Sequence, residues 1–81
     1  MGRTVPTFRE EIERVVARWE FFGRALRRED RIYLKRIIVK ARRNAAASSY
    51  AAFLNPVEGM MLSILMEQEK DIEELKNGHR F

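Results

Sequence analysis

The chain has 81 residues, of which 46% are hydrophobic and 35% charged, so it suits one small globular domain over 1–81 and is too short for two. It has a formal net charge of +4 and no cysteine, which excludes disulfide frameworks, thiolate metal sites and cysteine nucleophiles. It has neither a signal-peptide core nor a run of ~18 apolar residues, so we expect a cytoplasmic protein that does not cross a membrane. A chain of this length buries only about 60–65% of its unfolded surface, which favours self-association.

The first predicted helix covers residues 7–26. Thr7 and Glu10 have the spacing of a capping box, in which each side chain accepts a hydrogen bond from the backbone N–H of the other residue. Apolar residues then recur every three or four positions, as in a helix with one buried face: Phe8, Ile12, Val15, Trp19, Phe22 and Leu26. The break that follows contains no glycine or proline, so one continuous helix through it is the alternative.

The second predicted helix covers residues 30–54, which contain neither glycine nor proline. Its first half is strongly basic, whereas its second half consists mostly of alanine and serine. Small side chains let two helix axes approach to the short end of the usual ~8–10 Å range. We therefore expect the second half to pack closely against a neighbouring helix.

The third predicted helix covers residues 56–76. Asn55 suits the N-cap position and Pro56 suits the first helical position. A C-cap signal ends the helix, and a frayed tail is expected over 77–81. Three helices of similar length with short connections predict an all-α antiparallel three-helix bundle that can self-associate through its helices.

Basic side chains are concentrated in the second predicted helix. Residues 27–43 hold eight basic and two acidic side chains, whereas 55–76 hold two basic and six acidic ones. On a helical wheel, three cations lie opposite the apolar seam and four more fill one flank. The row opposite the seam is Arg36, Lys40 and Arg43, and the flank is Arg28, Arg31, Lys35 and Arg42. Such a surface can bind phosphates without sequence preference, so contact with nucleic acid is the leading functional hypothesis.

The acidic third helix offers a competing interpretation of these charges. If the second and third helices form a hairpin about Asn55 and Pro56, Lys40 lies near Asp71. Lys35, Arg42 and other flanking cations would then pair with carboxylates, at about 0–1 kcal/mol for each exposed pair, while the row opposite the seam stays open. No helix-turn-helix or RNP motif supports a specific nucleic-acid function, so a solvated or protein-facing charged surface is the alternative.

Two apolar residues fall outside the predicted buried stripes. Phe21 points roughly 120° away from the stripe of its helix, and Val39 lies within the basic surface of the second helix. An exposed phenylalanine among arginines and glutamates is a candidate anchor for a partner or a symmetric dimer. Phe21 and Val39 are therefore the predicted interface residues, and coverage of Phe21 by the third helix is the alternative.

The sequence contains no set of residues that supports a catalytic function. His79 is the only histidine, and neither a Ser/His/Asp set nor a Glu-x-x-His pair can be assembled. We therefore predict no catalytic residue, no metal site and no cofactor. The sequence favours a small non-enzymatic binding module that contacts nucleic acid. The alternative is a protein–protein interaction or homo-oligomeric assembly module whose charged faces serve solubility and register.

Overall fold

A computed structural model describes residues 7–50 and 55–78. All regular structure in these two ranges is helical, which confirms the all-α class. The elements are α1 (Phe8–Ala25), a short 3-10 turn η1 (Arg28–Asp30), α2 (Arg31–Arg43), α3 (Ala45–Tyr50) and α4 (Pro56–Gly78). Within the described ranges, no helix combines the length and apolarity that a membrane crossing needs.

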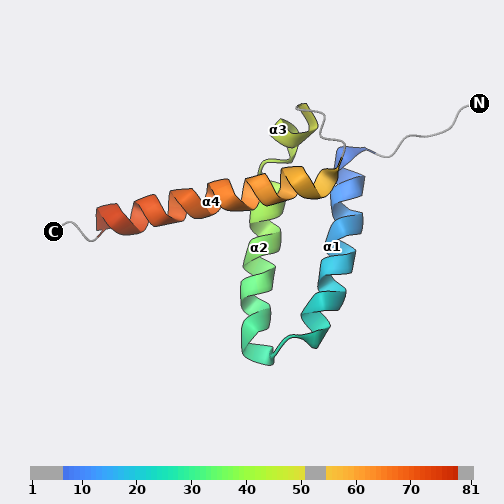
Figure 1. The fold of residues 1–81 in the computed structure, drawn as a ribbon, viewed down its shortest axis with the longest axis horizontal. Helices are drawn as coiled ribbons and strands as arrows, with labels where there is room; N and C mark the ends of the chain where they lie inside the picture. Colours follow the sequence, from blue (N-terminus) through green and yellow to red (C-terminus); the bar gives the residue numbers. More distant parts are fainter. Residues whose placement is uncertain (1–6, 51–54, 79–81) are drawn as a thin grey trace, which may run out of the picture.

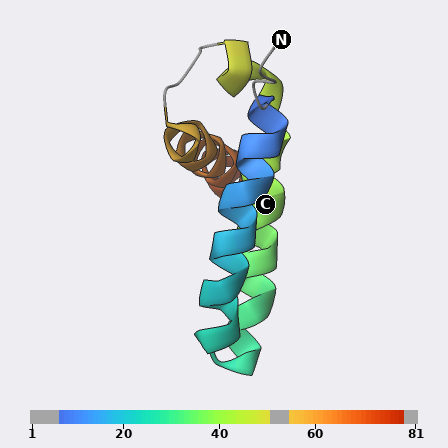
Figure 2. The same ribbon diagram turned by 90° about the vertical axis from the view of Figure 1, so that its right-hand side faces the viewer.

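The helices α1 and α2 form a hairpin, and α4 crosses one face of it. Figure 1 shows α1 and α2 side by side and antiparallel, with α4 lying across them and extending past α2. The side view in Figure 2 places α4 on one face of this hairpin. The buried residues of α4 all fall between Gly59 and Glu67, so α4 contacts the hairpin over a short segment only. The predicted antiparallel three-helix bundle is therefore not confirmed, because its third helix would be buried along its whole length.

The beginning of α1 follows the predicted capping box. The Thr7 hydroxyl accepts a hydrogen bond from the Glu10 N–H at 3.1 Å, and the Glu10 carboxylate accepts from the Thr7 N–H at 2.9 Å. At the other end, Leu26 has an extended backbone and stops the helix after Ala25. The break before α2 is therefore real, and the alternative of one continuous helix is wrong.

The helix predicted over 30–54 is divided at Asn44. The backbone of Asn44 leaves the helical region, with φ −111° and ψ 33°, so α2 ends before it and α3 begins after it. Residues 51–54 of the predicted helix lie outside the described residues. At the C-terminus α4 continues through Gly78, beyond its predicted end, and 79–81 of the predicted frayed tail are not described.

The core lies where the four α-helices meet. Eight apolar residues there are at most 5% exposed: Ile12, Val15, Val16, Ile38, Ala41, Ala45, Met60 and Ile64. Small residues of the second predicted helix do pack closely, since Ala45 and Ser48 are buried. Near the hairpin turn, a Cβ on Gly23 would lie 2.8 Å from Leu34 Cδ2, so Gly23 leaves room for the end of the Leu34 side chain. Phe22, placed in the core by its periodicity, is instead 60% exposed.

Candidate functional site

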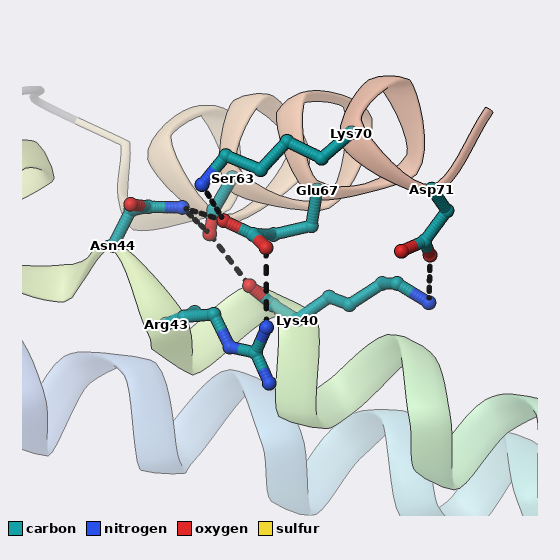
Figure 3. A network of polar contacts seen from close by, with 7 residues as sticks. All are labelled: Lys40, Arg43, Asn44, Ser63, Glu67, Lys70 and Asp71. Carbon is teal, nitrogen blue, oxygen red and sulfur yellow. Dashed lines mark hydrogen bonds and ion pairs between the residues drawn. The ribbon is translucent and has the colours of Figure 1, made fainter. Parts of the chain in front are cut away.

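A polar network joins the end of α2 to the middle of α4 (Figure 3). Its centre is the Glu67 carboxylate, whose side chain is 4% exposed. Oε2 accepts hydrogen bonds from Asn44 Nδ2 at 3.1 Å and from Lys70 Nζ at 3.0 Å. Oε1 accepts from an Arg43 guanidinium nitrogen at 3.2 Å. The hydrogen bond from Asn44, followed by that from Lys70, holds the pKa of Glu67 below its ordinary value, although burial acts in the opposite direction.

Ser63 extends this network to the backbone of α2. Asn44 Nδ2 also donates to the Ser63 hydroxyl at 2.9 Å, and that hydroxyl donates to the Lys40 carbonyl at 2.6 Å. The Lys40 carbonyl belongs to the last turn of α2, where carbonyls lack partners within the helix. In the described residues, no buried side-chain nitrogen or oxygen is left without a hydrogen-bond partner. The network therefore fixes the position at which α4 crosses α2.

The predicted phosphate-binding row is largely engaged by α4. Lys40 Nζ lies 3.0 Å from the Asp71 carboxylate, which confirms the predicted proximity of these two residues. Arg43 pairs with Glu67, and the Arg36 guanidinium lies 5.4 Å from the centroid of the Tyr33 ring. The expectation that this row stays open is wrong for Lys40, whose side chain is only 23% exposed, whereas the Arg43 side chain pairs with Glu67 but is still 59% exposed. The reason is that α4 crosses α2 (Figure 1) and brings Asp71 and Glu67 to these two cations.

The flanking cations divide into two groups. Arg42 forms a bidentate ion pair with Glu13 of α1, with both N–O distances at 2.8 Å, and so does not pair with α4 as predicted. This hydrogen bonding lowers the pKa of Glu13. The other group, Arg28, Arg31 and Lys35, lies at the hairpin turn. Within the described ranges these three form no ion pair, and Arg31 donates to the Arg24 carbonyl at 3.3 Å.

An apolar groove of about 650 Å³ lies in the angle between α4 and the α1–α2 hairpin. One wall comes from the hairpin and the other from α4, and only one lining residue is polar. The lining residues are Trp19, Phe22, Leu34, Ile37, Val57, Met61, Ile64, Leu65 and Gln68. Phe22, Met61 and Leu65 are 60%, 46% and 56% exposed, so the groove is open to solvent. We call it the α4 groove.

The opposite side of α4 carries a second hollow, of about 470 Å³. Leu62 and Met66 line it and are about half exposed, and Ala47 and Ser48 of α3 form part of its far wall. The first half of α4 therefore presents apolar side chains to the core, to the α4 groove and to this second hollow. A surface helix of a globular protein normally presents only one apolar stripe.

Both predicted interface residues are exposed, but they lie elsewhere. Phe21 is 67% exposed and Val39 is 51% exposed, and neither lines the α4 groove. The Arg24 guanidinium lies 4.7 Å from the centroid of the Phe21 ring and covers part of it. Periodicity missed the groove because it assigned Phe22 to the core. The signal that points to the groove is the high density of apolar residues in 57–66, which cover more of the helix than one stripe.

The described residues contain no group of three or more histidine, cysteine, aspartate or glutamate side chains arranged to hold a metal ion. His79 lies outside the described residues. The open surfaces in the described ranges include the α4 groove, the second hollow and the basic hairpin turn.

These features define a small all-helical protein with an open apolar surface beside a fixed helix crossing. A family model matches residues 1–80, and the chain belongs to this family, described as a domain of unknown function, DUF8156. No curated protein and no solved structure matches the chain.

Proposed function

We propose that this chain is a non-enzymatic protein–protein interaction module whose binding surface is the α4 groove. The observation that carries the proposal is the exposure of Phe22, Met61 and Leu65 around a groove with one polar lining residue. Leu62 and Met66, on the side of the second hollow, add further exposed apolar side chains to the same helix. Exposed apolar side chains gathered in one groove are typical of a site that a partner covers.

The polar network supports this function by holding the groove in shape. The groove exists because α4 crosses the hairpin, and Glu67 and Ser63 fix that crossing from the side of α4 that faces the hairpin. Ser63 and Glu67 are 2% and 3% exposed. The charged residues outside this network keep the rest of the surface hydrated. This division of roles matches an assembly module more closely than a phosphate-binding helix, because Lys40 and Arg43 already pair with α4.

Sedimentation velocity combined with fluorescence of anilinonaphthalene sulfonate tests the proposal. The wild type should either associate between low micromolar and submillimolar concentration or, as a monomer, bind the dye. Leu65→Glu should abolish the association or the dye binding, while Leu75→Glu, at a 62% exposed site near the end of α4, should not. Far-UV circular dichroism should show equal helix content in all three proteins. A wild type that neither associates nor binds the dye contradicts the proposal.

A second candidate function is polyanion binding at the hairpin turn. Six cations between Arg24 and Arg36 form no ion pair among the described residues: Arg24, Arg27, Arg28, Arg31, Lys35 and Arg36. Aromatic rings lie among them, since Arg24 covers Phe21 and Arg36 covers Tyr33. Exposed cations beside aromatic rings are a combination found in single-stranded nucleic-acid binders. The nucleic-acid hypothesis is therefore kept, and its proposed binding site moves from Lys40 and Arg43 to the hairpin turn.

Fluorescence anisotropy with labelled single-stranded and duplex DNA and RNA tests the second candidate. Affinity should fall steeply between about 50 and about 200 mM salt because binding releases counterions. Charge reversal of Arg28, Lys35 and Arg36 should weaken binding and reduce the salt dependence. The matched control reverses Arg9, Arg14 and Lys76, which changes the net charge equally at exposed sites away from the turn. Equal loss of binding in both triple variants contradicts a site at the turn.

A further inference from the structure

A small pocket lies between α1 and α2 close to the hairpin turn, and no residue of α4 lines it. Its apolar part is formed by Gly23 of α1 and by Leu34 and Ile38 of α2. Gly23 is buried and Ile38 is 5% exposed, whereas the charged residues of the lining are exposed, so the pocket is open to solvent on its charged side. We call it the turn pocket. It shares only Leu34 with the α4 groove.

Cations surround the opening of the turn pocket. They are Arg24 of α1 and Arg31 and Lys35 of α2. Arg31 donates a hydrogen bond to the Arg24 carbonyl at 3.3 Å, which holds its guanidinium group beside the last turn of α1. Among the described residues none of these three cations forms an ion pair, and neither does Glu20, the one acidic residue of the lining. The pocket therefore combines an apolar floor with an excess of positive charge, which suits an anion that has an apolar part.

The volume of the turn pocket, about 180 Å³, limits the apolar part of such a ligand. An apolar cavity of roughly 150 Å³ binds benzene, whereas pockets for drug-sized ligands have about 300–1,000 Å³. One six-membered ring therefore fits the turn pocket, and the fused rings of a purine are too large for it. The ligand that matches both size and charge is a single ring with anionic groups attached nearby.

We infer that the turn pocket binds one pyrimidine base of a single-stranded nucleic acid, and that Arg24, Arg31 and Lys35 bind the phosphates on either side of this base. The inference rests on the second candidate function, polyanion binding at the hairpin turn, and names the kind of strand and its contacts. A single strand presents unpaired bases between phosphates, which is the combination that the pocket requires. A duplex does not, because its bases are paired and stacked inside the helix.

Glu20 favours a base over a bare anion as the group inside the pocket. A phosphate or carboxylate there would lie close to the Glu20 carboxylate, and like charges repel. A base instead brings N–H donors, and the amino group of cytosine is a donor from which a glutamate can accept a hydrogen bond. Cytosine is also a base with a single ring, so it is the base that we expect to fit best.

NMR of the isoleucine methyl groups tests this inference, because an aromatic ring shifts the resonance of a methyl group that it contacts. Ile38 lines the turn pocket and not the α4 groove, whereas Ile64 lines the α4 groove and not the turn pocket. A short oligodeoxycytidylate at low salt should therefore shift Ile38 and leave Ile64 unchanged. An abasic strand of equal length keeps the phosphates, so it should bind severalfold more weakly and leave Ile38 unchanged. An equal shift of Ile38 by an oligodeoxyadenylate would overturn the restriction to a single ring.

Lys35→Met and Lys76→Met are matched variants for the phosphate contacts. Each removes one positive charge from an exposed side chain and keeps its aliphatic part. Lys35 lies at the opening of the turn pocket, whereas Lys76 lies near the end of α4. Lys35→Met should weaken binding of the oligodeoxycytidylate severalfold, and Lys76→Met should leave it nearly unchanged. Equal weakening in the two variants would contradict a phosphate contact at Lys35.

The outcomes separate this inference from the candidate function on which it rests. Binding of the oligodeoxycytidylate with a shift of Ile38 that the abasic strand lacks supports the inference. Binding without a shift of Ile38, or with the same shift for the abasic strand, overturns the base-binding pocket and leaves polyanion binding in place. Cytidine monophosphate that shifts Ile38 at concentrations as low as the strand does overturns the strand as the ligand. Absence of binding overturns both the inference and the candidate function.

Discussion

Asn44 Nδ2 and Glu67 Oε2 lie 3.1 Å apart at the point where α2 ends and α4 crosses it (Figure 3). The same Asn44 nitrogen lies 2.9 Å from the Ser63 hydroxyl, so one side-chain amide contacts two turns of α4. Asn44 is also the residue whose backbone interrupts the predicted helix over 30–54. The helix break and the crossing of α4 therefore depend on the same residue. The backbone of Asn44 ends α2, and its side chain binds α4.

The exchange Asn44→Asp tests this contact with almost no change in shape. The new carboxylate cannot donate to Glu67 or Ser63, and it places a second negative charge beside Glu67. We expect a loss of about 1–3 kcal/mol in the free energy of unfolding, measured by urea denaturation at neutral pH. Asn77→Asp, the same exchange at an exposed position of α4, is the control and should change stability by less than about 0.5 kcal/mol. Equal effects at the two sites would show that Asn44 does not hold the crossing.

The lowered pKa of Glu67 makes the stability of the protein dependent on pH. The folded carboxyl has a lower pKa than the unfolded one, so its charged form favours folding at pH values above the unfolded pKa, ~4.3. Glu13 acts in the same direction through Arg42. We therefore expect the urea midpoint to be constant from neutral pH to about 5.5 and to decrease as the pH falls further.

Glu67→Gln is the variant that isolates this contribution. It keeps the shape of the side chain and removes the titrating group, so the decrease in the urea midpoint below pH 5.5 should become shallower. Glu73→Gln, an exposed position of the same helix, should keep the wild-type profile. If both variants titrate like the wild type, the acid sensitivity arises elsewhere in the chain.

The Arg42–Glu13 ion pair should contribute little despite its ideal geometry. Its N–O distances are both 2.8 Å, but the two side chains are 44% and 55% exposed, so water and salt screen the attraction. A double-mutant cycle with Arg42→Met and Glu13→Gln should give a coupling energy below about 1 kcal/mol. The coupling should decrease further at high salt, whereas a larger and salt-independent value would mean that the pair is effectively buried.

Local signals in the sequence predicted the parts of the fold that local chemistry determines. The capping box of Thr7 and Glu10 depends on residues three apart, and it forms as predicted. Lys40 and Asp71 also lie close together, as predicted, although α4 crosses α2 (Figure 1) and does not form the hairpin from which the prediction was made. The crossing of α4 over the hairpin was not predictable in this way. It depends on a buried Glu67, and periodicity alone does not distinguish a buried glutamate from an exposed one.

The candidate site was missed for a related reason. Phe22 continues the apolar stripe of α1, so its spacing predicts burial, but α4 crosses the hairpin instead of running along it (Figure 1) and leaves Phe22 60% exposed. The apolar residues of α4 at adjacent positions were interpretable as a core or as an interface. Only the position of the hairpin shows that Met60 is buried in the core whereas Met61 is exposed at the α4 groove.

Met60 and Met66 should respond differently to the same truncation. Met60 is 1% exposed in the core, so Met60→Ala removes buried contacts and leaves a cavity, at a cost of about 2–5 kcal/mol in the free energy of unfolding. Met66 is 46% exposed, so Met66→Ala should cost less than about 1 kcal/mol. Thermal and urea unfolding at low micromolar concentration compare the two proteins with association minimised. Similar losses in both variants would place Met66 in a buried environment and contradict the open second hollow on its side of α4.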